Sequence, residues 1–132
     1  MQNLYHPEAR FTDPVFQDLS CREVKAMWQM LLTSAKDLHV EFRDVHSDQY
    51  TGRCKWDAWY TFSRTGRHVH NQITAAFEFR EGLIFRHTDR FDLWKWSRQA
   101  LGASGLLLGW APVVQNKVRS MARKNLDAFL SK

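Results

Sequence analysis

Asp89, at the centre of an apolar run, is the residue best placed in this sequence for acid–base chemistry. It lies between Gly82 and Trp96, where strict alternation puts it on one strand face with His87 and with apolar neighbours (Leu83, Phe85, Phe91 and Leu93). A carboxylate among apolar side chains loses its hydration, so it must be paired or protonated. Desolvation also raises the pKa of a carboxyl group, which then exchanges protons near neutral pH.

Two interpretations of Asp89 follow from its surroundings. It is either a pocket residue that takes part in proton transfer, or one half of a structural ion pair with Lys55 or Arg53. His87, on the same face, either orients Asp89 or simply packs in the core.

Lys55 and Asp57 are the next candidates, because alternation over Arg53–Ser63 puts them on one face. Both could project to Asp89 across a curved sheet, or they could form a solvated strand face. Asp13 precedes Pro14, and this order suits a turn former whose carboxylate bonds nearby backbone.

The elements that must position these residues are one helix and four strands. Ser20 and Glu23 form a capping box, and an apolar stripe behind them predicts a helix over residues 20–36 (Val24, Met27, Trp28, Leu31, Leu32 and Ala35). Four strand-like segments follow, joined by turns at Asp48–Gly52, Thr65-Gly66 and Glu81-Gly82: Leu38–His46, Arg53–Ser63, Arg67–Arg80 and a long final strand from Gly82 to Trp96.

Short connections predict antiparallel pairing in sequence order, and strands this long must twist and coil. We therefore expect an α+β fold, a cone-shaped, strongly curved antiparallel sheet wrapped by helices. The helix closes the concave side of this sheet. An apolar row would lie on the convex side, and it predicts a homodimer through that face (Trp56, Ala58, Tyr60 and Phe62).

The basic charge of the chain is confined to its end. The net charge is +5, while residues 1–96 hold 13 Lys and Arg against 13 Asp and Glu. A basic surface for nucleic acid is therefore not expected. Beyond the predicted domain, residues 102–132 are expected to form a connector and a helix that packs on the domain. The apolar connector is Ala100–Pro112, which overlaps the end of the domain and has Leu106–Trp110 at its centre. The helix is basic and amphipathic and runs from Val113 to Leu130. The same helix could bind a membrane surface, but its apolar stripe equally suits its own domain.

Composition limits the remaining possibilities. A chain of 132 residues, 44% hydrophobic, suits one folded domain. It has no apolar run of membrane-spanning length and no signal-peptide pattern, and Cys21 and Cys54 have no redox or metal spacing. We expect a cytoplasmic protein. His68, His70 and His87 make no recognisable metal spacing, so neither a metal nor a cofactor is expected.

A helix followed by four long strands that end in Asp89-x-x-Asp92-Leu93 resembles the nuclear transport factor 2-like superfamily. This superfamily includes ketosteroid isomerases, limonene epoxide hydrolases and SnoaL-like polyketide cyclases. The resemblance covers roughly residues 3–101, the predicted domain 1–101. It implies a cone-shaped α+β domain that holds a small hydrophobic molecule.

Specific roles are implied by matching motifs. Asp13 of Asp-Pro-Val matches the proton-shuttling base of ketosteroid isomerases. Asp89 matches a catalytic Asp of the epoxide hydrolases, and Lys55-Trp-Asp57 stands where that family has Arg-x-Asp, so the planar fork of Arg is absent. Polyketide cyclases use an Asp that aligns with Asp92. The resemblance begins after the family's first helix, which carries the isomerase oxyanion Tyr, so we expect no counterpart of that Tyr here.

The resulting hypothesis is a SnoaL-like or ketosteroid isomerase-like pocket protein. Its carboxylates could catalyse isomerisation, cyclisation or epoxide hydrolysis without a cofactor. We expect the pocket to be lined by His87, Phe91, Trp28 and Trp59. The alternative is a non-catalytic dimer that binds a hydrophobic ligand or acts as a scaffold.

Overall fold

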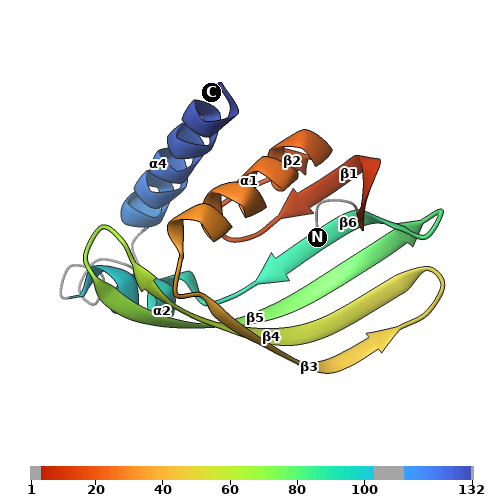
Figure 1. Ribbon diagram of the computed structural model, residues 1–132, viewed down its shortest axis with the longest axis horizontal. Helices are drawn as coiled ribbons and strands as arrows, with labels where there is room; N and C mark the ends of the chain where they lie inside the picture. Colours follow the sequence, from red (N-terminus) through yellow and green to blue (C-terminus); the bar gives the residue numbers. More distant parts are fainter. Residues whose placement is uncertain (1–3, 103–111, 132) are drawn as a thin grey trace.

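The computed structural model describes residues 4–102 and 112–131 as an α+β fold built on one curved sheet (Figure 1). The strands of the sheet are ordered β2-β1-β6-β5-β4-β3. Their bounds are β1 Tyr5–Thr12, β2 Leu19–Ser20, β3 His39–Ser47, β4 Thr51–Phe62, β5 Arg67–Arg80 and β6 Leu83–Arg90. The helices are α1 Cys21–Ser34, α2 Leu93–Leu101 and α4 Pro112–Leu130. The predicted fold class is therefore confirmed.

The four long strands pair antiparallel in sequence order, as the short turns predict. Glu81 and Gly82 both have positive φ, 56° and 75°, which suits the tight turn between β5 and β6. The sheet is nevertheless mixed, because β1 pairs with β6 in parallel. A parallel neighbour needs a long crossover, and the rest of the chain supplies it.

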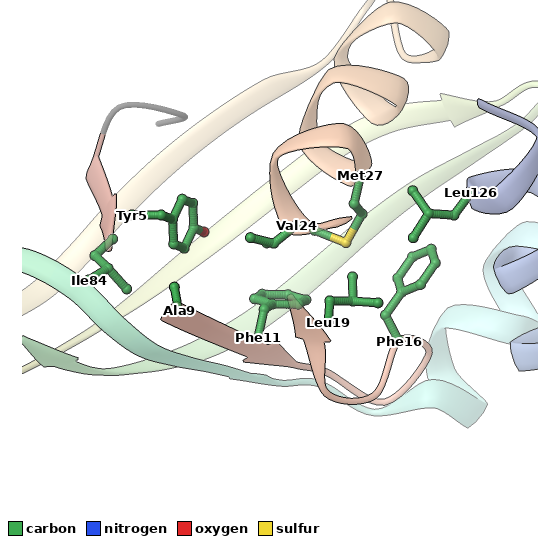
Figure 2. Packing of buried hydrophobic residues seen from close by; sticks show 9 residues of the cluster. All are labelled: Tyr5, Ala9, Phe11, Phe16, Leu19, Val24, Met27, Ile84 and Leu126. Atoms are coloured by element: carbon green, nitrogen blue, oxygen red, sulfur yellow. The ribbon is translucent and has the colours of Figure 1, made fainter. Parts of the chain in front are cut away.

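Helix α1 begins at the predicted capping box. The Ser20 side chain accepts a hydrogen bond from the Glu23 amide, and the Glu23 carboxylate accepts one from the Ser20 amide. Val24 and Met27 are buried in the core with Phe11 of β1 and Leu19 of β2 (Figure 2). The first part of the predicted stripe thus faces the concave side of the sheet, whereas its members Leu31 and Leu32 are exposed.

The final strand is shorter than expected. It ends at Arg90, and Asp92 caps α2 by accepting a hydrogen bond from the Lys95 amide at 3.1 Å. A β-bulge at Phe85 also breaks its alternation, because Phe79 pairs with Ile84 while Glu78 pairs with Arg86. One extra residue moves every later side chain of the strand to the other face.

Helix α4 packs beside α1 (Figure 1). Its Leu126 is fully buried in the core, and Arg123 forms an ion pair with Glu23 of α1. Arg119 Nε donates a hydrogen bond to the Pro14 carbonyl at 2.7 Å. The predicted apolar centre of the connector, Leu106–Trp110, lies outside the described residues.

Candidate functional site

A hydrogen-bonded chain of four side chains crosses the concave side of the sheet. His87 Nε2 lies 2.7 Å from Asp89 Oδ1, and His87 Nδ1 lies 2.8 Å from the Tyr5 hydroxyl. The Trp28 Nε1–H donates to that hydroxyl at 2.9 Å. These contacts join β1, α1 and β6, and Tyr5, His87 and Asp89 are all buried. Asp89 therefore has the partner that its apolar surroundings demand, and the partner is His87 rather than Lys55 or Arg53.

The donors and acceptors of this chain assign its protons. When Asp89 is ionised, His87 Nε2 must carry a proton and donate it. In neutral His87, Nδ1 then accepts, so the Tyr5 hydroxyl donates to it. Trp28 has only a donor and occupies a lone pair of the same hydroxyl. The direction Trp28 to Tyr5 to His87 to Asp89 satisfies every member.

Among the described residues, His87 is bonded to one oxygen of Asp89. No hydrogen bond to Asp89 Oδ2 is formed by the described residues, whereas Oδ1 is bound by His87. Asp89 as a whole is only 4% exposed.

Asp13 follows β1 and reaches the same region. Its Oδ1 accepts hydrogen bonds from the amides of Val15 and Phe16, at 2.7 and 2.6 Å, so the turn-forming role is present. Burial raises the pKa of Asp13 to about 6, and the negative charge of Asp89 adds to this increase. The backbone hydrogen bonds and His87 act in the opposite direction. A carboxyl group that titrates near pH 6 can exchange a proton at neutral pH.

Aromatic side chains extend from this cluster toward solvent. Trp28 contacts His87 and also Trp56 of β4, with ring centroids 6.4 and 6.2 Å apart. Trp56 in turn lies 6.4 Å from Phe42 of β3, which is 67% exposed. These rings form an apolar surface between solvent and the buried polar chain. Trp28 and His87 thus lie together on the concave side, and Phe91 is half-buried just beyond β6.

Lys55 and Asp57 lie on the opposite face of the sheet, so the prediction that they meet Asp89 is wrong. Asp89 pairs with Ala75, which pairs with Cys54, and this register puts Asp89 on the face of Cys54. Lys55 follows Cys54 and points away, where it is exposed. The bulge at Phe85 is the cause, since a regular strand would have aligned Asp89 with Thr74 and Lys55.

Asp57 has its own partners on that outer face. It forms an ion pair with Arg43, and His70 Nε2 donates to its Oδ2 at 2.9 Å. Arg43, and then His70, hold the pKa of Asp57 below its usual range. Trp59 lies here as well, stacked on His70 with ring centroids 4.6 Å apart. Trp59 is therefore not part of a concave pocket, contrary to expectation.

The apolar row predicted for the convex side lies on the concave side instead. Trp56 contacts Trp28 of α1, and the Tyr60 hydroxyl accepts a hydrogen bond from Trp96 Nε1 of α2 at 2.7 Å. Phe62 also contacts Trp96, edge to face. Helices α1 and α2 thus pack on this row, which removes the reason for predicting a dimer through it.

Tyr5 is the functional candidate that sequence reasoning missed. Its segment matched the family, but no sequence pattern indicated that the Tyr5 hydroxyl would meet His87. The two side chains are brought together by the parallel pairing of β1 with β6, which local patterns do not predict. Arg43 and His70 were missed for the same reason, as their contact with Asp57 depends on strand register.

Residues 4–102 and 112–131 contain neither a metal-binding cluster nor a membrane-spanning helix. No group of three or more His, Cys, Asp or Glu side chains there could hold a metal ion. No helix in these ranges is long and apolar enough to cross a membrane.

Comparison with known sequences places the chain in a family. The sequence model of the SnoaL-like domain matches residues 1–87, about two thirds of the chain. The chain therefore belongs to the SnoaL-like domain family. None of the curated proteins matches it significantly.

Solved structures share the fold at low sequence identity. IdmH from Streptomyces antibioticus, a candidate polyketide cyclase, is 19% identical with a TM-score of 0.63, over 76% of this chain and 84% of that one. A candidate SnoaL-like polyketide cyclase from Jannaschia is 14% identical with a TM-score of 0.67, over 77% and 76%. A Catenulispora acidiphila protein with a ketosteroid isomerase-like fold, in complex with trimethylamine, is 12% identical with a TM-score of 0.64, over 75% and 78%.

Proposed function

We propose that this chain binds a small hydrophobic molecule on the concave side of its sheet. It removes a proton from the carbon next to a carbonyl group of that molecule and then returns it. The observation that carries this proposal is the juxtaposition of two carboxyl groups of different character. Asp89 is buried and held by His87 through Oδ1, and burial raises the pKa of nearby Asp13 to about 6. Pairs of carboxyl groups in different environments are typical of acid–base sites.

Each residue has a role in this proposal. Asp13 is the base that takes the proton and returns it, since both of its forms are accessible near neutral pH. Asp89 Oδ2 accepts a hydrogen bond from a hydroxyl or enol of the substrate. His87 and Tyr5 hold Asp89 in place, and the Trp28, Trp56 and Phe42 rings receive the apolar part of the molecule. Isomerisation and cyclisation fit this arrangement, and neither needs a cofactor.

Epoxide hydrolysis by Asp89, Asp57 and Lys55 together is not supported, because the sheet separates them. The family and its polyketide cyclase relatives favour an enolisable carbonyl compound. We therefore place the substrate class among flat, hydrophobic ketones and diketones.

Deuterium exchange tests this proposal without knowledge of the product. Hydrophobic cyclic ketones and diketones are incubated with the protein in D2O, and NMR follows the loss of the α-proton. We expect acceleration that Asp13→Asn reduces by roughly 10²- to 10⁴-fold, with Asp89→Asn also impaired. Asp57→Asn makes the same chemical change on the opposite face of the sheet, and this variant should catalyse exchange at the wild-type rate. In the wild type the rate should rise as pH increases through about 6, where Asp13 ionises.

Other outcomes discriminate between the alternatives. Binding without exchange would leave the non-catalytic ligand-binding protein as the better description. Neither binding nor exchange across the panel would contradict the proposal.

A homodimer remains a prediction with no interface assigned. Light scattering at micromolar concentration tests this prediction. A mass of 15.6 kDa, that of one chain, would contradict the dimer.

A further inference from the structure

The loop between β1 and β2, which carries Asp13, is bonded to helix α4. Arg119 Nε donates a hydrogen bond to the Pro14 carbonyl at 2.7 Å. Pro14 directly follows Asp13, so this contact lies one residue from the proposed base. The Arg119 guanidinium is itself oriented, because its Nη1 donates to Asn116 Oδ1, three residues earlier in α4, at 2.8 Å. An oriented side chain therefore holds the loop at Pro14.

The direction of the Asp13 carboxylate depends on the conformation of this loop. Its Oδ1 accepts hydrogen bonds from the amides of Val15 and Phe16, and the Asp13 amide donates to the Phe16 carbonyl at 2.8 Å. Phe16 is buried in the core cluster that also contains Leu126 of α4 (Figure 2). These contacts close a short turn with Pro14 inside it, so a shift of Pro14 would also move the carboxylate.

Arg119 lies on the side of α4 that packs on the domain. Three apolar residues follow it at the spacing of one helical face and pack in or against the core: Ala122, Leu126 and Leu130. Arg123, about one turn after Arg119, forms an ion pair with Glu23 of α1. Both arginines thus anchor the same helix, and of the two Arg119 contacts the loop that carries the proposed base.

We infer that Arg119 is a positioning residue for Asp13. This inference rests on the proposed function, in which Asp13 takes the α-proton and returns it. Arg119 acts through its hydrogen bond to Pro14, which fixes the loop and with it the direction of the carboxylate. Helix α4 lies beyond residues 1–87, the part that matches the family. The proposed base is therefore held by a segment that the family match does not include.

Two substitutions at Arg119 separate its hydrogen bond from its charge. Arg119→Met removes every donor and keeps an unbranched apolar side chain for packing. Arg119→Gln also removes the charge, but its amide nitrogen is bonded to Cδ, as Arg Nε is, so a donor remains at that position. Arg123→Met is the matched control, since it removes the other anchoring arginine and leaves the contact with Pro14 intact.

The first measurement is the rate of α-proton exchange in ketones. We expect Arg119→Met to lower this rate roughly 10- to 100-fold, because a displaced base is no longer aligned with the bond it must break. Arg119→Gln and Arg123→Met should each change the rate by less than about threefold, since one keeps the donor and the other breaks an ion pair outside the loop.

The second measurement needs no substrate. Carbon-13 NMR follows the titration of the Asp13 carboxyl group, assigned with Asp13→Asn. In wild type the pKa of Asp13 is raised to about 6 by burial, and Asp89 and His87 of β6, which also act on it, are the same in all variants. A loosened loop in Arg119→Met admits water, so the pKa of Asp13 should fall toward the usual value of about 4. Arg119→Gln and Arg123→Met should keep the wild-type midpoint.

Several results would overturn the inference. One is an unchanged rate and midpoint in Arg119→Met. Equal effects of Arg119→Met and Arg119→Gln would assign the role to charge, and equal effects of Arg119→Met and Arg123→Met would assign it to α4 as a whole. If wild type exchanges no ketone, the proposed function fails, whereas a midpoint shifted in Arg119→Met alone would still show that Arg119 positions Asp13.

Discussion

Replacing Asp13 with Asn should make the protein more stable at neutral pH while it impairs proton transfer. The fold raises the pKa of this carboxyl group to about 6, chiefly by burying it. Asn cannot ionise, yet its side-chain oxygen can still accept the hydrogen bonds from the amides of Val15 and Phe16. The substitution therefore removes a buried charge and keeps the turn.

The magnitude follows from the pKa difference. An unfolded Asp titrates near pH 4, and one pKa unit corresponds to about 1.4 kcal/mol, so ionised Asp13 costs the fold roughly 3 kcal/mol above pH 6. Between about pH 4 and pH 6 the folded state binds more protons than the unfolded chain, so wild-type stability falls as pH rises through this window. The figure is an upper bound, because a carboxylate accepts stronger hydrogen bonds than an amide.

Urea denaturation of wild type and Asp13→Asn at about pH 4 and about pH 8 measures this effect. The variant should gain up to roughly 3 kcal/mol relative to wild type between the two conditions. Asp18→Asn, an exposed position in the same loop, is the control and should show little change. A difference that does not depend on pH, or a variant less stable than wild type at high pH, would refute the reasoning about Asp13.

The remaining predictions concern the buried chain, the C-terminal helix and the outer face. Tyr5→Phe should cost roughly 1–3 kcal/mol, because it leaves the buried His87 ring and the half-buried Trp28 ring without a hydrogen-bond partner. Chemical denaturation checks this, and Tyr50→Phe, at a 68% exposed residue, should be neutral. Leu126→Ala should cost roughly 2–5 kcal/mol in the same assay. Val113→Ala, at a 79% exposed residue of the same helix, should cost far less. Lys55→Gln should leave the rate of α-proton exchange in ketones unchanged. A reduced rate would show that Lys55 takes part in the site after all.

The local elements were predictable because their signals are local. The Ser20–Glu23 capping box fixes the start of α1, and the Glu81-Gly82 pair marks a two-residue turn. Alternation located β4 and β5 to within two residues. Asp92 was predicted to lie in the final strand, but it is the N-cap of α2. An Asp before a helix-forming segment is a common N-cap, so the sequence did carry this signal.

Which side chains of different strands share a face of the sheet was not predictable, because this depends on one extra residue, Phe85, in β6. Alternation tells which side chains of one strand share a face, but the relation between strands depends on their register. The bulge at Phe85 shifts Asp89 from the row of Lys55 to the row of Cys54. Asp89 and His87 were identified by chemistry alone, whereas Tyr5 needed the parallel pairing of β1 with β6.

A crystal structure with a bound hydrophobic cyclic ketone would test the central claim most directly. The account predicts the ketone on the concave side, with its oxygen or α-carbon within hydrogen-bond reach of Asp89 Oδ2 and Asp13, and its ring against Trp28 and Trp56. A ketone bound instead on the outer face, beside Asp57 and His70, would contradict it.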